Sequence, residues 1–77
     1  MTEPKNDRRD PDRALALAGK AVSIERSPIY LDTLAEAYYA NGLRHEAIET
    51  IMEALSAATE NRGYYQGQLE RFRSSEP

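Results

Sequence analysis

The sequence of 77 residues has no cysteine and no tryptophan, and histidine and phenylalanine each occur once. Without cysteine the chain can form no disulfides and offers no thiolate ligands to a metal ion. No apolar run approaches the roughly 20 residues of a membrane-spanning helix. Residues 1–10 also lack the apolar centre of a signal peptide. We therefore expect a soluble, cytoplasmic protein with no membrane partner, cofactor or metal.

A surplus of basic residues is also missing, because 10 Lys and Arg residues face 13 Asp and Glu residues and the net charge is -3. Binding to nucleic-acid phosphates needs cations that dominate one face. Two small basic groups remain, in residues 8–9 and at Arg62, Arg71 and Arg73. As a solvated tail and a basic helix they need no ligand, so we expect no nucleic-acid partner.

What the sequence does contain is a regular set of helix starts and ends. Residues 1–9 are polar and of mixed charge, which predicts a flexible tail. Asp10-Pro11 and Ser27-Pro28 each place a capping side chain before a proline suited to the first helical position. Asn41-Gly42 is typical of a helix end, and Asn61 can begin another helix. These signals predict helices over about 11–25, 28–41, 44–58 and 62–73, within a domain of residues 10–74 followed by a tail at 75–77.

Apolar residues in the two middle segments follow helical spacing. The second predicted helix has one stripe at i, i+3, i+4 and i+7, formed by Leu31, Leu34, Ala35 and Tyr38. The third has a matching stripe, formed by Ala47, Ile48, Ile51, Ala54, Leu55 and Ala58. A short connection between two such helices makes them antiparallel, and the alanines allow their axes to approach closely. We expect an all-α fold, an antiparallel helical-hairpin stack of about four helices.

One pattern occurs twice, 33 residues apart: Ala14-Leu15 with Ala18, Ala21 and Val22 recurs as Ala47-Ile48 with Ile51, Ala54 and Leu55. A repeat of that length in a helical chain is typical of stacked-repeat proteins. Residues 28–61 resemble the tetratricopeptide repeat (TPR), a two-helix unit that builds protein-binding solenoids. Leu31 stands where the family often has tryptophan, Ala35 where it often has glycine, and Thr59 where a proline is expected. Residues 12–25 and 62–73 resemble half repeats on either side.

The resemblance implies a non-enzymatic protein-protein interaction module. In the TPR family, the first helices of successive repeats line a groove that binds a peptide. The positions of this chain that match the groove are Ile29, Asp32, Thr33, Glu36, Tyr39, Gln66, Glu70 and Arg73. The chain lacks the lysines and asparagines with which carboxylate-clamp TPR proteins hold the C-terminal tails of heat-shock chaperones.

The expected groove carries acidic groups on one helical face. Asp32, Glu36 and Tyr39 fall at i, i+4 and i+7, which predicts a preference for basic or neutral ligands. The two carboxylates have no accompanying nucleophile or oxyanion donor, so catalysis is not expected. His45 is the only histidine, and a metal site there would require distant carboxylates.

The first predicted helix is apolar around more of its circumference than one neighbour can cover. Repeat units bury such faces only against other units. We therefore expect self-association, most simply as a homodimer, through Leu15, Leu17, Ala21 and Ile24. The alternative to self-association is a monomer in which another segment covers this helix. Two alternatives to the interaction module also stay open: a structural end-piece of a longer solenoid without a peptide ligand, and a regulatory appendage of an enzyme.

Overall fold

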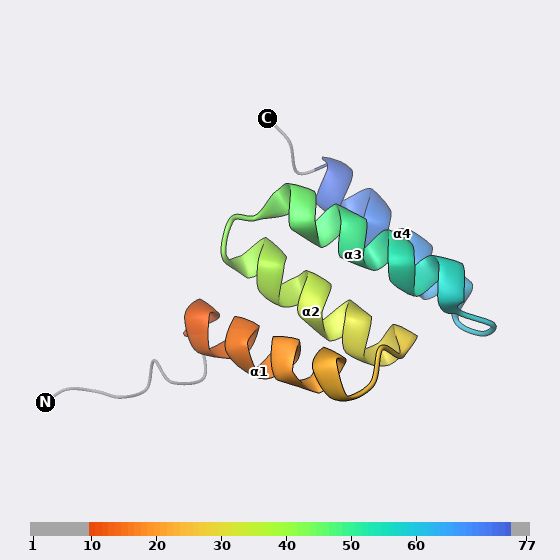
Figure 1. The fold of residues 1–77 in the computed structure, drawn as a ribbon. Helices are drawn as coiled ribbons and strands as arrows, with labels where there is room; N and C mark the ends of the chain where they lie inside the picture. The colour runs from red at the N-terminus through yellow and green to blue at the C-terminus, as the bar shows by residue number, and fades with distance from the viewer. Residues whose placement is uncertain (1–9, 75–77) are drawn as a thin grey trace, which may run out of the picture.

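The computed structural model describes residues 10–74, which form four α-helices (Figure 1). The helices are α1 (Pro11–Ile24), α2 (Pro28–Ala40), α3 (Arg44–Ala57) and α4 (Arg62–Ser74). The predicted all-α class is confirmed, and each helix ends within one residue of its predicted end. The tails predicted for residues 1–9 and 75–77 lie outside the described residues. Within residues 10–74, none of the helices has the length and apolar character needed to cross a membrane.

The predicted start signals act as helix caps. Asp10 Oδ1 accepts a hydrogen bond from the backbone N–H of Asp12 at 3.0 Å, and Ser27 Oγ accepts one from the N–H of Tyr30 at 3.3 Å. In α1 and α2, the capping residue is followed by a proline at the first helical position. These caps satisfy N–H groups that have no partner inside the helix, so both helix starts are determined locally.

The turn between α2 and α3 makes the two helices antiparallel. Gly42 has a φ of 79°, a left-handed conformation that glycine adopts without steric cost. The N–H groups of Gly42 and Leu43 donate to the carbonyls of Tyr39 and Tyr38, which satisfies two carbonyls at the end of α2. Asn41 Nδ2 also donates to the Pro11 carbonyl at 2.8 Å, so this turn is tied to the start of α1.

The end of α3 differs from the end of α2. The chain reverses through Asn61, whose φ is 59°. The Arg62 guanidinium then donates to the carbonyls of Leu55 at 2.6 Å and Ala58 at 3.1 Å. A cation at this position also interacts favourably with the negative end of the α3 dipole. Arg62 therefore ties the start of α4 to the end of α3.

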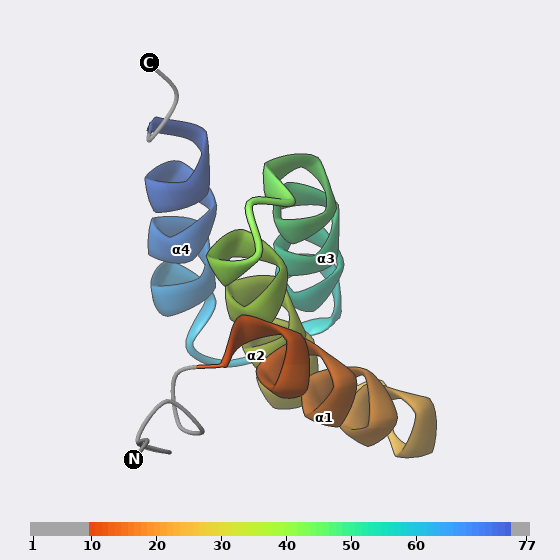
Figure 2. The ribbon, with the colours of Figure 1, turned by 90° about the vertical axis from the view of Figure 1, so that its left-hand side faces the viewer.

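The helices form a stack in which α2 packs against both α1 and α3, and α3 also packs against α4 (Figure 1). In the perpendicular view, α1 lies at one end of the stack and α3 and α4 lie side by side at the other (Figure 2). The core contains six side chains with 0% exposed surface: Leu31, Ala35, Ala47, Ile51, Ala54 and Phe72. Three of the six are alanines, which explains how α2 and α3 approach so closely.

One ion pair links the α1–α2 connection to α3. Arg26 donates through Nε and Nη2 to the two carboxylate oxygens of Glu53, at 2.7 and 2.6 Å. These hydrogen bonds hold the pKa of Glu53 below its usual value. Because the folded pKa is the lower one, the stabilisation is present above the unfolded pKa of about 4.3 and is lost as the pH falls through the folded value.

We expect Glu53→Gln to lower the thermal midpoint at pH 7 by about 3 °C, since both side chains are substantially exposed. The variant should also lose less stability than the parent chain between pH 5 and pH 3. Thermal melts across that range measure both effects. Glu49→Gln, an exposed residue on the same helix, is the matched control. Equal behaviour of the two variants would contradict the assignment.

Candidate functional site

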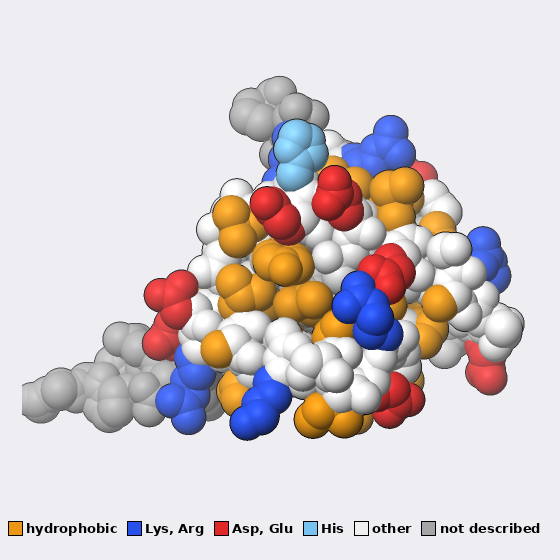
Figure 3. Space-filling model, in the orientation of Figure 1, with side chains coloured by type: hydrophobic (Ala, Val, Ile, Leu, Met, Phe, Trp, Pro, Cys, Tyr) orange, Lys and Arg blue, Asp and Glu red, His pale blue; other side chains and the backbone are white. Residues whose placement is uncertain are grey.

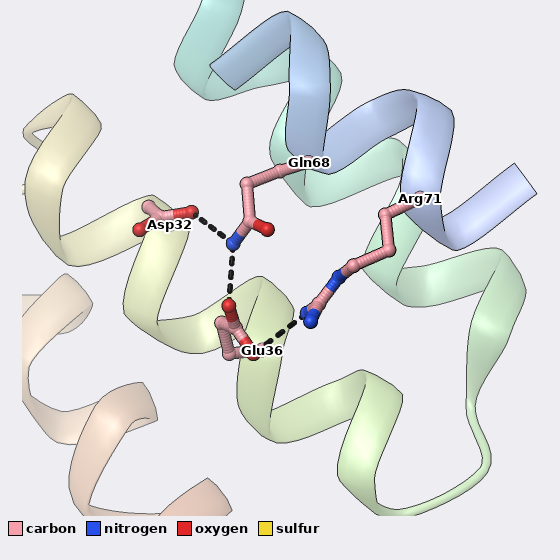
Figure 4. A network of polar contacts seen from close by, with 4 residues as sticks. All are labelled: Asp32, Glu36, Gln68 and Arg71. Carbon is pink, nitrogen blue, oxygen red and sulfur yellow. Dashed lines mark hydrogen bonds and ion pairs between the residues drawn. The ribbon is translucent and has the colours of Figure 1, made fainter. Parts of the chain in front are cut away.

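A polar network joins α2 to α4 (Figure 4). Gln68 Nε2 donates to Asp32 Oδ1 at 3.0 Å and also to Glu36 Oε2, while Arg71 Nη2 donates to Glu36 Oε1 at 3.0 Å. The carboxylates are one helical turn apart on α2, and Gln68 and Arg71 are three residues apart on α4. Both pairs therefore project from one side of their helices. We call these four residues, Asp32, Glu36, Gln68 and Arg71, the seam.

Aromatic packing continues the seam into the core. The rings of Tyr39 and Phe72 stack with their centroids 4.7 Å apart. The Arg71 guanidinium lies over both rings, 5.4 Å from the Tyr39 centroid and 5.1 Å from the Phe72 centroid. Tyr39, a predicted groove residue, is half-buried, and its ring lies against Phe72 of α4.

Tyr64 is the aromatic side chain that remains accessible near the seam, with 57% of its surface exposed. The negative charge of Asp32 raises the pKa of its phenol, with burial, Glu36 and a hydrogen bond to Asp32 adding to the rise. The phenol O–H is thus directed toward Asp32, while the ring stays exposed. An exposed aromatic ring with a polar tip is a side chain well suited to protein contacts.

Two exposed residues of α2 lie beside Asp32. Ile29 has 65% of its surface exposed, and Thr33 is exposed with its hydroxyl donating to the Ile29 carbonyl at 3.1 Å. An open cleft of about 300 Å³ adjoins Ile29, between the start of α2 and the α3–α4 connection, and Tyr65 lines its other side. We call Ile29, Thr33 and Tyr64 the contact surface.

The structure does not bring the eight predicted groove residues together on one surface. Glu70 and Arg73 line another cleft, of about 470 Å³, together with Arg44 and Ile48 of α3. Gln66 donates to Glu70 at 3.2 Å. These three residues of α4 therefore do not join Asp32 and Glu36 in one groove, as the resemblance implied.

The physical reason is the rotation of α4 about its own axis. The buried stripe of α4 consists of Tyr65, Leu69 and Phe72, and it points into the space between α2 and α3. This orientation turns the side with Gln68 and Arg71 toward α2, and it turns Gln66, Glu70 and Arg73 away from it. A shift of one repeat length along the sequence carries no information about this rotation.

Gln68 and Arg71 are thus site residues that sequence reasoning missed. A signal for Gln68 was present, because it lies three residues after Tyr65 and four before Phe72, on the apolar stripe itself. It is 7% exposed. A polar side chain at such a position requires an internal hydrogen-bond partner. The spacing alone does not say that the partners are two carboxylates of α2.

The other chemical interpretations gain no support from the geometry. Asp32 and Glu36 accept hydrogen bonds from Gln68 and Arg71, an arrangement that holds α4 in place. Arg62 and Arg71 of the C-terminal basic group contact carbonyls and a carboxylate of the same chain. His45 is exposed. Among residues 10–74, no three His, Cys, Asp or Glu side chains lie close enough to hold a metal ion.

No family model, no curated protein and no solved structure matches this chain. The resemblance to the TPR therefore stays a prediction.

Proposed function

We propose that this chain is a TPR-like, non-enzymatic protein-interaction module that presents the contact surface of Ile29, Thr33 and Tyr64 to a peptide or partner protein. The observation that carries the proposal is that several core positions one repeat apart are buried alike. Leu31 and Tyr65 are both buried, as are Ala35 and Leu69. Ala18 of α1 and Ile51 of α3, which also correspond in the repeat, are 3% and 0% exposed. Repetitive burial of this kind is the structural signature of stacked-repeat proteins.

The contact surface favours a neutral or basic ligand. The two carboxylates of the seam are only partly balanced by the Arg71 guanidinium, which leaves one negative charge between Ile29 and Tyr64. Ile29 supplies apolar area next to the 300 Å³ cleft, and the exposed ring of Tyr64 supplies an aromatic surface. This combination suits an extended peptide that places one apolar side chain in the cleft and an amide or cation beside Asp32.

The test is selection from a random peptide library on the intact chain, followed by fluorescence anisotropy of the selected peptides. We expect Ile29→Ser and Tyr64→Ser each to weaken binding about tenfold, as residues at the centre of a small interface do. Binding should also weaken as the salt concentration rises. Met52→Ser is the matched control, because Met52 is 51% exposed on α3, outside the contact surface.

Peptides that bind both contact-surface variants as tightly as the parent chain would place the site elsewhere. Asp32→Asn and Glu36→Gln would test the same surface by removing its negative charges. The structure makes them less suitable, because both carboxylates hold α4 through Gln68 and Arg71. A loss of binding in those variants could come either from a lost ligand contact or from loosening of α4, and the measurement would not distinguish the two causes.

A structural role as an end-piece of a helical stack is the second candidate. The side of α4 that faces away from α2 is polar, with Gln66, Glu70 and Arg73 exposed. Terminal units of repeat proteins have such polar outer faces. At the other end of the stack, α1 exposes Leu17 and Ile24. Failure to select any peptide, with the fold intact, would favour this role over peptide binding.

A further inference from the structure

One side of α1 has no covering element among residues 10–74. Four apolar residues, at i, i+3, i+7 and i+10, form this side, which we call the open flank: Ala14, Leu17, Ala21 and Ile24. Leu17 is 60% exposed and Ile24 is 78% exposed. Figure 3 shows hydrophobic side chains exposed along α1 and in the middle of the same face, between α1 and α3.

The opposite side of α1 is already used. Ala18 and Val22 are 3% and 4% exposed and belong to the main core, since α1 packs against α2. Leu15 is half-buried and packs against the same core. The sequence placed Leu15 in the self-association surface, and the structure moves it to the interior contact. Leu17 and Ile24 are therefore the large side chains that the open flank offers.

The internal repeat shows that the open flank is built for helix packing. Ala14 and Ala21 correspond to Ala47 and Ala54 of α3, which are 0% exposed because α2 lies against α3 there. In α1, by contrast, Ala14 is exposed and Ala21 is half-buried. Small residues at these positions allow a second helix to approach closely. The open flank thus has the composition of a covered helix face while the described residues leave it bare.

We propose that a second copy of the chain covers the open flank by two-fold, antiparallel pairing of α1 with α1. A two-fold axis at the centre of the flank places Leu17 against Ala21 of the second copy and Ile24 against Ala14 of the second copy. Each large side chain then meets a small one, so the two surfaces complement each other. A two-fold interface requires such self-complementarity, because both copies contribute the same residues.

The alternation of large and small residues along the flank selects the antiparallel arrangement. In a parallel two-fold pair, Leu17 would meet Leu17 of the second copy and Ala21 would meet Ala21, so large side chains would meet large ones and small side chains would leave gaps.

Sedimentation equilibrium of the intact chain from 5 µM to 1 mM tests the proposal. Because one pair of 14-residue helices makes a small interface, we expect a dissociation constant of roughly 10 to 500 µM. The weight-average mass should rise from 8.7 kDa toward twice that value. Leu17→Glu and Ile24→Glu should each weaken the dimer at least tenfold, about 1.4 kcal/mol. Met52→Glu, with similar exposure on α3, should leave the dissociation constant unchanged.

Circular dichroism establishes that each variant remains helical. A constant mass of 8.7 kDa up to 1 mM, or a dimer that tolerates Leu17→Glu and Ile24→Glu, would overturn the proposal.

Discussion

Phe72→Ala should destabilise the fold by about 3–5 kcal/mol, the usual cost of removing a fully buried aromatic side chain. Phe72 is 0% exposed and stacks on Tyr39 at 4.7 Å. Its ring is the largest fully buried side chain in the core and connects α4 to α2. A small domain has a total free energy of unfolding of only about 5–15 kcal/mol, so the variant should be close to unfolding at 25 °C.

Urea denaturation followed by circular dichroism measures this loss. Tyr64→Ala is the matched control, because Tyr64 is an aromatic residue of the same helix with 57% of its surface exposed. Its substitution should cost less than about 1 kcal/mol. Similar losses for the two variants would mean that α4 is not anchored through Phe72. Partial unfolding limited to α4 would also displace Tyr64, so Phe72→Ala should abolish peptide binding by the contact surface.

Ala47→Leu should destabilise the fold by about 1–3 kcal/mol through overpacking. Ala47 is 0% exposed and belongs to the same core cluster as Leu31 of α2 and Ile51 of α3. The added carbon atoms have no space there unless the two helices move apart. A thermal melt should show a midpoint lower by several degrees, because about 1 kcal/mol corresponds to 4–8 °C in a domain of this size.

The repeat supplies the control for this substitution. Ala14 occupies the position of α1 that corresponds to Ala47, but it is exposed. Ala14→Leu should therefore leave the midpoint nearly unchanged when it is measured at low micromolar concentration. Equal midpoints for Ala47→Leu and Ala14→Leu would contradict the close approach of α2 and α3 at Ala47.

The helices themselves follow from the sequence because their signals are local. Asp10 and Ser27 accept hydrogen bonds from backbone groups two or three residues away, and Gly42 adopts its left-handed conformation within a single turn. Such interactions need no distant partner. The apolar stripe of Leu31, Leu34 and Ala35 is likewise a property of one helix, and all three residues are buried. For these reasons the number, the ends and the buried faces of the helices were predictable.

The seam and the open flank were decided by tertiary structure. Asp32 and Glu36 looked like solvated ligand contacts, yet Gln68 and Arg71, more than 30 residues away, bond to them. Ala14 and Ala47 are equivalent in sequence, but only Ala47 has a helix packed over it. Local spacing assigns a residue to a side of its helix, whereas the rotation of α4 and the neighbour of each side depend on how four helices share one small core. Which helix covers each face depends on the whole chain, so the sequence of one segment does not determine it.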